Sequence, residues 1–329
     1  MRNAKIASVG MYAPERVLDN AYFDELLGKP VAGWLEENVE IFTRRWAADD
    51  ESSADMASAA ARQAMERAGV EPADIDLIVV ATDTPEQLSP STASVVQHQL
   101  GATNAGSFDL NSACSGFVAA LDVASKYIRG DDQYDHVLVI GVYAMSKYLN
   151  KRDHRTVSIF ADGAGAIVLS ATDQDSKGFL ASKLETLGAY YDAMGVYAGG
   201  TAMPISDEAI ANHDHQLKFV RKFPAELNPD NWTRLIRELT ARIGVSPKDV
   251  DNFFITQINV HAIRETLDRL EVPHERAHTV MHHFGYTGSA CIPMCMADAL
   301  DKGVLATGQL LVFLGSGGGV TFATAAFQY

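Results

Sequence analysis

The sequence predicts an α/β protein that is built from two related halves. Short apolar runs of strand length alternate along the chain with segments of helical periodicity, a pattern typical of sheets covered by helices. The stretch Arg62–Asp76 aligns without gaps with Arg237–Asp251, and seven of the fifteen positions are identical. The tripeptide Ser-Ala-Cys occurs at 112–114 and again at 289–291. Such a repeat predicts two packed sheets related by a pseudo-twofold axis.

The elements of the first half follow from apolar runs and their boundary residues. The stretch Ser53–Ala68 is expected to be a helix, because Ser52 or Ser53 can cap its start and Gly69 can end it. The apolar run Ile75–Thr82 is short, which favours a buried strand. Further strands are expected at Ile6–Tyr12, Gly106–Leu110, His136–Val142 and within Phe160–Leu169, with helices ending near Gly101 and spanning Val118–Ile128. Residues 20–45 have a mixed pattern and receive no assignment.

The second half repeats the helix, turn and strand of the first. After them, Cys295–Leu300 has a helical pattern and Leu310–Leu314 that of a strand. We therefore divide the chain into residues 1–172 and 173–329. In proteins of this architecture, clefts form where the halves meet at strand ends.

Cys114 is the candidate nucleophile of the first half. It lies between the expected strand Gly106–Leu110 and the expected helix Val118–Ile128, and its neighbours are small. The free N–H groups at a helix start stabilise a thiolate, so we expect an acidic, reactive thiol. The alternative is a buried structural cysteine, which is the commoner fate of a free thiol.

Composition excludes several classes of partner. The net charge of the 329-residue chain is −15, which argues against binding nucleic acid or an anionic membrane. No apolar run is long enough to cross a bilayer. The chain has three cysteines, without the spacing of a zinc site, so we expect no metal and a reducing, cytoplasmic location.

Three motifs together resemble those of the β-ketoacyl-ACP synthase III family of the thiolase superfamily. They are Ser112–Phe117 for the nucleophile, the glycine-rich turn Phe160–Ala166, and the closing loop Gly317–Thr321. The resemblance covers the whole chain and implies a thiolase-like αβαβα sandwich of two duplicated halves that forms a homodimer. It also implies that Cys114 is acylated by a thioester of coenzyme A or acyl carrier protein, with no resident cofactor. The backbone N–H groups of Cys114 and Gly318 would form the oxyanion hole.

Two positions of the second half depart from the family pattern. The family completes its site with the histidine of a His-Gln-x-Asn motif, but this chain reads Thr256-Gln257-Ile258-Asn259. The family's asparagine, in a Gly-Asn-Thr turn, is replaced by Tyr286. Thr256 and Tyr286 thus take the catalytic positions, while Asn259 matches the motif. A hydroxyl does not act as a base near neutral pH as imidazole does, so we expect weak malonyl decarboxylation.

The resemblance suggests roles for some other residues. Ser89 matches the loop position that the family inserts into the partner's acyl pocket, and its small size predicts a deeper pocket. Trp34, Arg44 and Arg155 fall near the family's coenzyme A site, although each could equally be an ordinary surface residue. His283 is an alternative histidine for the site. Cys291 occupies the repeated cysteine position, where we favour a structural role.

The function implied is acyl transfer through an acyl-Cys114 intermediate, including condensation with a malonyl thioester in fatty-acid or secondary-metabolite synthesis. One alternative is a non-decarboxylating acyl transferase or thioesterase. Another, from a different class, is a non-catalytic acyl-binding subunit of a larger synthase.

Overall fold

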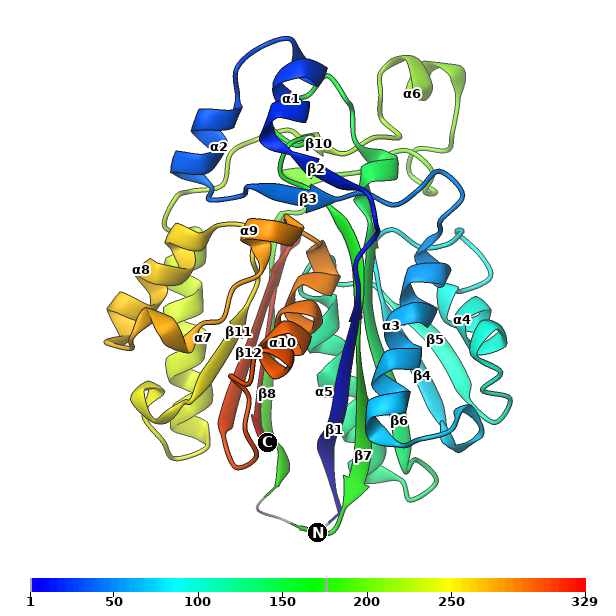
Figure 1. The fold of residues 1–329 in the computed structure, drawn as a ribbon, viewed down its shortest axis with the longest axis vertical. Coiled ribbons are helices and arrows are strands. Elements are labelled where there is room, and N and C mark those ends of the chain that lie inside the picture. Colours follow the sequence, from blue (N-terminus) through cyan, green and yellow to red (C-terminus); the bar gives the residue numbers. More distant parts are fainter. Residues whose placement is uncertain (1, 175–176) are drawn as a thin grey trace.

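Two β-sheets form the frame of the molecule (Figure 1). The computed structural model describes residues 2–174 and 177–329. One sheet has the order β1 (Asn3–Tyr12), β7 (Asp162–Thr172), β6 (His136–Ala144), β4 (Leu77–Ala81) and β5 (Gly106–Leu110). The other has the order β11 (Asn252–Ile255), β12 (Leu310–Gly317), β13 (Gly319–Gln328) and β8 (Gly178–Tyr190). Along the chain, the last strand of the first sheet ends at Thr172 and the first strand of the second sheet begins at Gly178.

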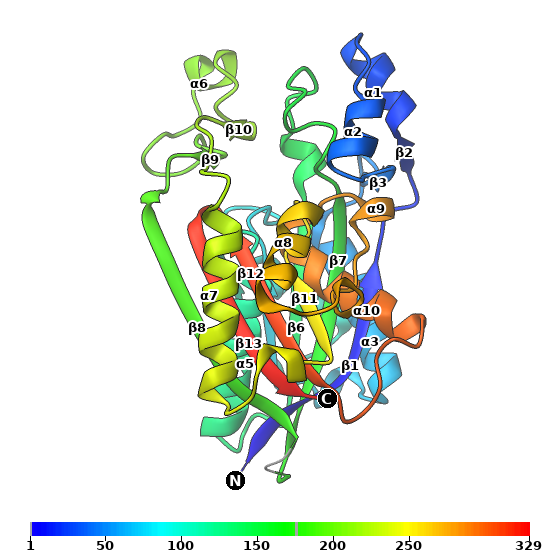
Figure 2. The ribbon, with the colours of Figure 1, turned by 90° about the vertical axis from the view of Figure 1, so that its left-hand side faces the viewer.

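Helices form three further layers around and between the sheets. Between the sheets lie α5 (Gly116–Gly130) and α10 (Cys291–Asp301), which contact strands of both. The outer face of the first sheet is covered by α3 (Ser53–Ala68) and α4 (Thr92–Leu100) (Figure 1). That of the second is covered by α7 (Leu227–Arg242) and α8 (Val260–Leu270) (Figure 2). Three apolar clusters fill the spaces between these layers. The expected αβαβα arrangement is confirmed.

The sequence repeat corresponds to a repeated helix–turn–strand unit. In the first copy α3 leads through η1 (Pro72–Asp74) to β4, and in the second α7 leads through η3 (Pro247–Asp249) to β11. Each helix is followed by a glycine with positive φ, 66° at Gly69 and 76° at Gly244, where a side chain would be strained. A capping box between Ser52 and Asp55 fixes the start of α3. Both strands are fully buried.

The stretch that the sequence left unassigned forms a cap over one end of the sheets (Figure 1). It contains α1 (Asn20–Leu27), α2 (Ala32–Asn38) and β3 (Thr43–Arg45), and β3 pairs with β2 (Val17–Asp19), which directly precedes the stretch. Arg44 holds this cap to the body, because its buried guanidinium donates to Asn20 and to the Ser158 carbonyl and lies over the ring of Phe23. Burial lowers the pKa of Arg44 to about 9. Arg44 is thus structural, although its type suggested a coenzyme A phosphate ligand.

The remaining elements of the described residues are short. They are β9 (Met194–Gly195), α6 (Asp207–Ala211), β10 (Lys218–Phe219), α9 (Met281–Phe284), η2 (Met145–Tyr148), η4 (His274–Arg276) and η5 (Gly288–Ala290). Across the described ranges, every helix is too short or too polar to span a bilayer.

Glycines let the central helix α10 approach β7 closely. A Cβ on Gly165 would lie 2.7 Å from both the Met294 nitrogen and the Pro293 Cβ atom. These neighbours are backbone and a rigid ring, so they cannot move aside as a flexible side chain does. In contrast, a Cβ on Gly188 of β8 would meet nothing within 4 Å.

We therefore predict that Gly165→Ala lowers the free energy of unfolding by about 2–3 kcal/mol, the usual cost of forcing extra volume into a packed core. Gly188→Ala is the matched control and should change stability by less than about 0.5 kcal/mol. Denaturant titration of both variants measures the difference. Equal stabilities would show that α10 does not press on β7 as described.

Candidate active site

Cys114 lies in a tight turn that joins β5 to α5. The turn is closed by hydrogen bonds from the Ser115 nitrogen to the Ser112 carbonyl (3.1 Å) and from the Gly116 nitrogen to the Ala113 carbonyl (2.9 Å). Ala113 has a φ of 46°, a left-handed conformation that is strained for alanine. Such strain persists only where surrounding contacts enforce it, and it concentrates at functional sites. The thiol is thus held in a fixed position just before the first turn of α5.

The second half reaches this turn through the loop between β12 and β13. A Cβ on Gly317 would lie 2.6 Å from the Cys114 nitrogen, and a Cβ on Gly315 would lie 2.8 Å from the Ser115 Cα atom. Only glycine permits so close an approach of the two backbones. The hydroxyl of Thr321 adds hydrogen bonds to the Ser115 hydroxyl (2.8 Å) and the Ser112 carbonyl (3.1 Å). The glycine loop and the cysteine turn therefore form one unit.

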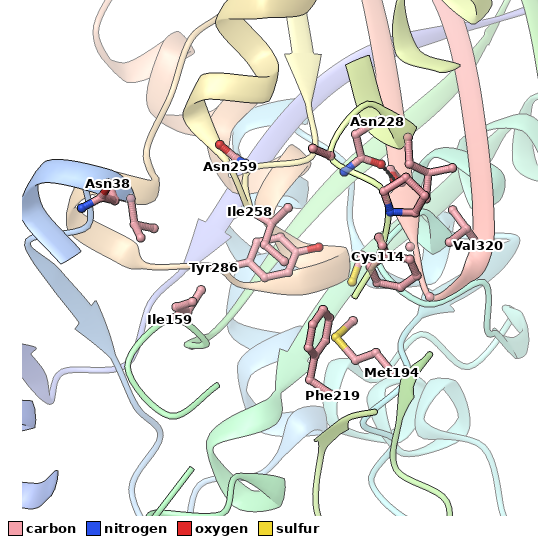
Figure 3. Close-up of a pocket in the computed structure, with 18 of the residues that line it drawn as sticks. Asn38, Cys114, Ile159, Met194, Phe219, Asn228, Ile258, Asn259, Tyr286 and Val320 are labelled. Atoms are coloured by element: carbon pink, nitrogen blue, oxygen red, sulfur yellow. Dashed lines mark hydrogen bonds between the residues drawn. The ribbon is translucent and has the colours of Figure 1, made fainter. Parts of the chain in front are cut away.

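A pocket of about 370 Å³ opens above Cys114 (Figure 3). Its lining is apolar except for the thiol, side-chain amides and hydroxyls, and none of the lining residues is charged. The lining is Trp34, Asn38, Val39, Cys114, Ile159, Met194, Phe219, Phe223, Pro224, Ala225, Leu227, Asn228, Ile258, Asn259, Tyr286, Ser316, Gly317, Gly318 and Val320. The site can thus hold a long uncharged group whose amides find hydrogen-bonding partners.

Tyr286 is the side chain of the second half that meets the thiol. Its hydroxyl points toward the sulfur of Cys114 (Figure 3) and hydrogen-bonds it, an interaction that acts to lower the pKa of the thiol. The ring is buried against Phe160, with centroids 5.5 Å apart, and beside Tyr143. Burial raises the pKa of Tyr286 well above its usual value, so the phenol stays neutral and serves as a donor.

The thiol itself is not acidic, contrary to the sequence-based expectation. Cys114 is only 4% exposed, and its pKa is raised, first by burial and then by the negative charge of Asp83. The hydrogen bond from Tyr286 opposes this shift without reversing it. The expectation considered the helix start alone and missed the cost of burying a thiolate.

Thr256 lies behind the pocket rather than in its wall. Its buried hydroxyl accepts a hydrogen bond from the Ser316 nitrogen (2.8 Å) and donates to the Ser316 carbonyl (3.4 Å). The hydroxyl therefore ties β11 to β12 and is not available to a substrate in this arrangement. Asn259 does line the pocket, and its side-chain oxygen caps α8 by accepting from the nitrogens of His261 and Ala262.

The other residues singled out in the sequence are spread over the surface. Trp34 is 56% exposed and lies at the rim of the pocket. Arg155 is exposed, pairs with Asp153, and lies outside the pocket lining. Ser89 is exposed on the loop between β4 and α4, also outside the lining. His283 is exposed beside Phe42 and does not enter the site.

Some pocket residues had no signal in the sequence. Met194 and Phe219 come from β9 and β10, whose short strands carry no repeat or motif. Asn228 stands in the first turn of α7, with its side-chain oxygen 3.2 Å from the Ser316 hydroxyl. Only the fold brings these three side chains to Cys114.

Comparisons with known proteins place this site in a family. Family models for 3-oxoacyl-[acyl-carrier-protein] synthase III and for its C-terminal part match residues 108–188 and 240–329. The chain is 34% identical to a β-ketoacyl-[acyl-carrier-protein] synthase III of Sulfurovum sp., covering 99% of this chain and 96% of the relative. The chain belongs to the 3-oxoacyl-ACP synthase III family. As a member of this family, the protein is an acyltransferase of the condensing-enzyme class.

Further relatives and solved structures agree with this assignment to the synthase III family. The acetoacetyl CoA synthase NphT7 of a Streptomyces species is 36% identical, with 99% of this chain and 98% of that protein covered. A synthase III structure from Pseudomonas aeruginosa superposes with a TM-score of 0.90 at 29% identity, covering 99% and 98% of the two chains. The priming β-ketosynthase of the R1128 polyketide pathway gives 0.89 at 28% identity, covering 98% and 95%.

We predict that Tyr286→Phe slows alkylation of Cys114 by iodoacetamide. In the native protein the hydrogen bond from Tyr286 lowers the pKa of the thiol. The variant lacks this bond, so the pKa of the thiol rises and the thiolate fraction at a given pH falls. A hydrogen bond to a charged group is worth roughly 1.5–3 kcal/mol, which corresponds to about tenfold or more in rate. Tyr143→Phe, in the same aromatic cluster, is the control and should leave the rate nearly unchanged. Alkylation is followed by peptide mapping over a range of pH, and an unchanged Tyr286→Phe profile would contradict the role.

Proposed function

We propose that Cys114 accepts an acyl group from a thioester of coenzyme A or acyl carrier protein and passes it to an acceptor. The observation that carries this proposal is the packing of the Gly317–Gly318 loop on the cysteine turn at the floor of an open pocket. A cysteine that served only in core packing would need neither the strained turn at Ala113 nor the close contact with Gly317. The names of the relatives, which refer to acyl carrier protein and to a CoA product, support this donor class.

The backbone N–H groups of Cys114 and Gly318 would stabilise the oxyanion formed during transfer. Both residues line the pocket, and Gly317, which precedes Gly318, lies against the Cys114 nitrogen. Rigid donors aimed at the developing charge are often the largest single contribution to catalysis, about 10²–10³-fold for one donor. The hydroxyl of Tyr286 would add a third donor near the sulfur.

The pocket suits the uncharged arm that carries the thioester. Asn228 and Asn259 offer amide groups along the wall, and Trp34 offers an exposed ring at the rim, suited to stacking. A pantetheine arm is itself a chain of amides and methylenes, so these groups match it. Arg155 lies outside the pocket lining, and we assign it no role at the adenine-phosphate end.

We further propose a homodimer in the cytoplasm. Strand β5 is at an open edge of the first sheet, which in an isolated chain leaves unpaired backbone groups. Beside it the loop before α4 is exposed, and Leu88 is 85% exposed. A second copy would cover both features and would place Ser89 at the partner's acyl pocket. The cytoplasmic location is supported by three free cysteines.

The acceptor is the open question of this site. Thr256 has no free hydroxyl, and Tyr286 is bulkier than the family's asparagine, so the pair fits poorly as a holder for a malonyl enolate. Condensation with a malonyl thioester and transfer without decarboxylation therefore remain the two routes. A non-catalytic acyl-binding subunit is the rival from another class.

The decisive test is intact-mass measurement after mixing the protein with acyl-CoA donors from acetyl to octanoyl. We expect a stable mass gain of one acyl group that maps to Cys114, is lost in Cys114→Ala and persists in Cys291→Ala. Because the small Ser89 predicts a deeper acyl pocket, we expect that acyl loading does not fall steadily as the acyl chain of the donor lengthens. A protein that gains no acyl mass from any donor would be the non-catalytic subunit.

We also predict that the native protein releases carbon dioxide from malonyl-CoA slowly. A missing enolate donor costs about 10²–10³-fold, and Thr256→His combined with Tyr286→Asn should restore part of this loss. The single variant Thr256→Ser, which keeps the hydroxyl bonded to Ser316, is the control. Release by the native protein as fast as by the double variant would show that Thr256 and Tyr286 suffice.

A further inference from the structure

Asp83 is a carboxylate beside Cys114 that neither the sequence motifs nor the proposed function explains. It comes two residues after Ala81, the last residue of β4. Ala81 pairs with Leu110 of β5 and with Gly141 of β6, and the hydrogen bond from the Thr82 nitrogen to the Leu110 carbonyl continues this register. Asp83 is therefore level with Ser112 of the cysteine turn and with Tyr143.

The alternation of side chains directs Asp83 toward the same layer as the thiol. Leu77, Val79 and Ala81 all belong to the central apolar cluster that includes Cys114 and Tyr143, whereas Ile78 and Val80 face the outer helices. Ala81 itself lies against the start of α5, since a Cβ on Gly116 would be 3.4 Å from the Ala81 Cβ atom. Because side chains alternate between the two faces of a strand, Asp83, two residues after Ala81, is expected on the same inner face as Ala81.

One oxygen of Asp83 is buried without a hydrogen-bond partner within the described residues. Asp162 is the informative comparison, because burial raises the pKa of both carboxyls to about 6. Yet Asp162 accepts from the nitrogens of Ala47 and Ser146, both at 2.8 Å, and from the Ser146 hydroxyl. Asp162 is a satisfied structural carboxylate. In Asp83, by contrast, one buried oxygen has no hydrogen bond to offset the loss of hydration, as expected for a group that exchanges protons.

Among the titratable groups around it, Asp83 is the one suited to accept a proton. Its charge acts on Cys114 of the turn after β5, on Tyr143 of β6 and on Tyr148 of η2. All three are neutral groups with raised pKa values. The nearby carboxylates Glu86, on its own loop, and Asp109, on β5, accept from backbone nitrogens at the starts of α3 and α4. Thr256 is already bonded to Ser316, and His283 is exposed. Asp83 is also outside the pocket lining, but it is the one of these three whose charge acts on the Cys114 thiol.

We propose that Asp83 is the general base that takes the proton from the acceptor as the acceptor attacks acyl-Cys114. This inference rests on the proposed function, because it requires the acyl-Cys114 intermediate. The acceptor is accordingly one that brings its own proton on oxygen or nitrogen, rather than a malonyl carbanion formed by loss of carbon dioxide.

The step balances in protons and electron pairs. The acceptor oxygen or nitrogen forms a bond to the acyl carbon, and its proton passes to Asp83. The tetrahedral intermediate then expels Cys114, breaking the bond between the acyl carbon and sulfur, and Asp83 returns the proton to the sulfur. The raised pKa of Cys114 favours this return, since the departing sulfur binds a proton strongly. Asp83 is ionised before and after the cycle.

The test follows the deacylation of acetyl-Cys114 by mass, with water and with methanol as probes. In the native protein the rate should fall several-fold from pH 7 to pH 5, because Asp83 is protonated below a pKa of about 6. Asp83→Asn should deacylate on the order of 10²-fold more slowly, without this pH step. A flat native profile, or an Asp83→Asn variant as fast as the native protein, would overturn the proposal.

Two readouts separate a lost base from a damaged site. Removing the charge of Asp83 should lower the pKa of Cys114, so alkylation by iodoacetamide should not slow. Because the pKa of Asp83 is raised on folding, its ionised form is unfavourable in the native state above pH 6, and Asp83→Asn should raise the melting temperature at pH 8 more than at pH 5. If alkylation and deacylation slow together, Asp83 is structural and the proposal fails. If acetyl-CoA does not load Cys114 at all, the proposed function fails first.

Discussion

The contact of two backbones at the centre of the molecule is the constraint on which the site depends. Gly315 and Gly317 approach the cysteine turn more closely than any residue with a Cβ allows. This contact joins the second sheet to the first at the start of α5. It fixes the strained turn at Ala113, forms the floor of the pocket and brings the backbones of two distant segments together. The halves thus form a site that neither would form alone.

Burial governs the chemistry of this site more than the helix start does. The pocket wall has no charged lining residue, and the thiol is almost fully buried, so the uncharged form of Cys114 is favoured. A neutral thiol with one phenolic donor needs a proton acceptor elsewhere for each transfer. The resemblance implies that the family uses an imidazole at the position of Thr256, and the hydroxyl of Thr256 is already bonded to the Ser316 backbone. Asp83, two residues after the end of β4, has one buried oxygen without a hydrogen-bond partner among the described residues, and it is the proton acceptor that we propose.

The sequence predicted those features that depend on local pattern. The bounds of α3 followed from Ser52 and Gly69, and the repeat with α7 and β11 indicated the two halves. Cys114, Tyr286, Gly318, Asn259 and Trp34 were predicted as site residues, and all five line one pocket. Features that depend on the partners of a side chain could not be predicted. The sequence offered Arg44 as a possible coenzyme A ligand, because its buried contacts with Asn20 and Ser158 could not be seen in it. Asp83 was passed over because an unpartnered oxygen has no signature in sequence.

The duplicated cysteines show why a motif alone does not make an active site. Ser289-Ala290-Cys291 repeats the nucleophile tripeptide and also precedes a central helix. In this second copy, the Ser289 hydroxyl donates to the Val142 carbonyl, and its own carbonyl lies against Gly141. Its helix α10 packs on β1 and β7, and Cys291 is outside the pocket lining, with its pKa raised to about 12. The repeated tripeptide therefore packs in the core in the second half and lies at the floor of a pocket in the first, and the difference is made by the pocket and by which side chains face the sulfur.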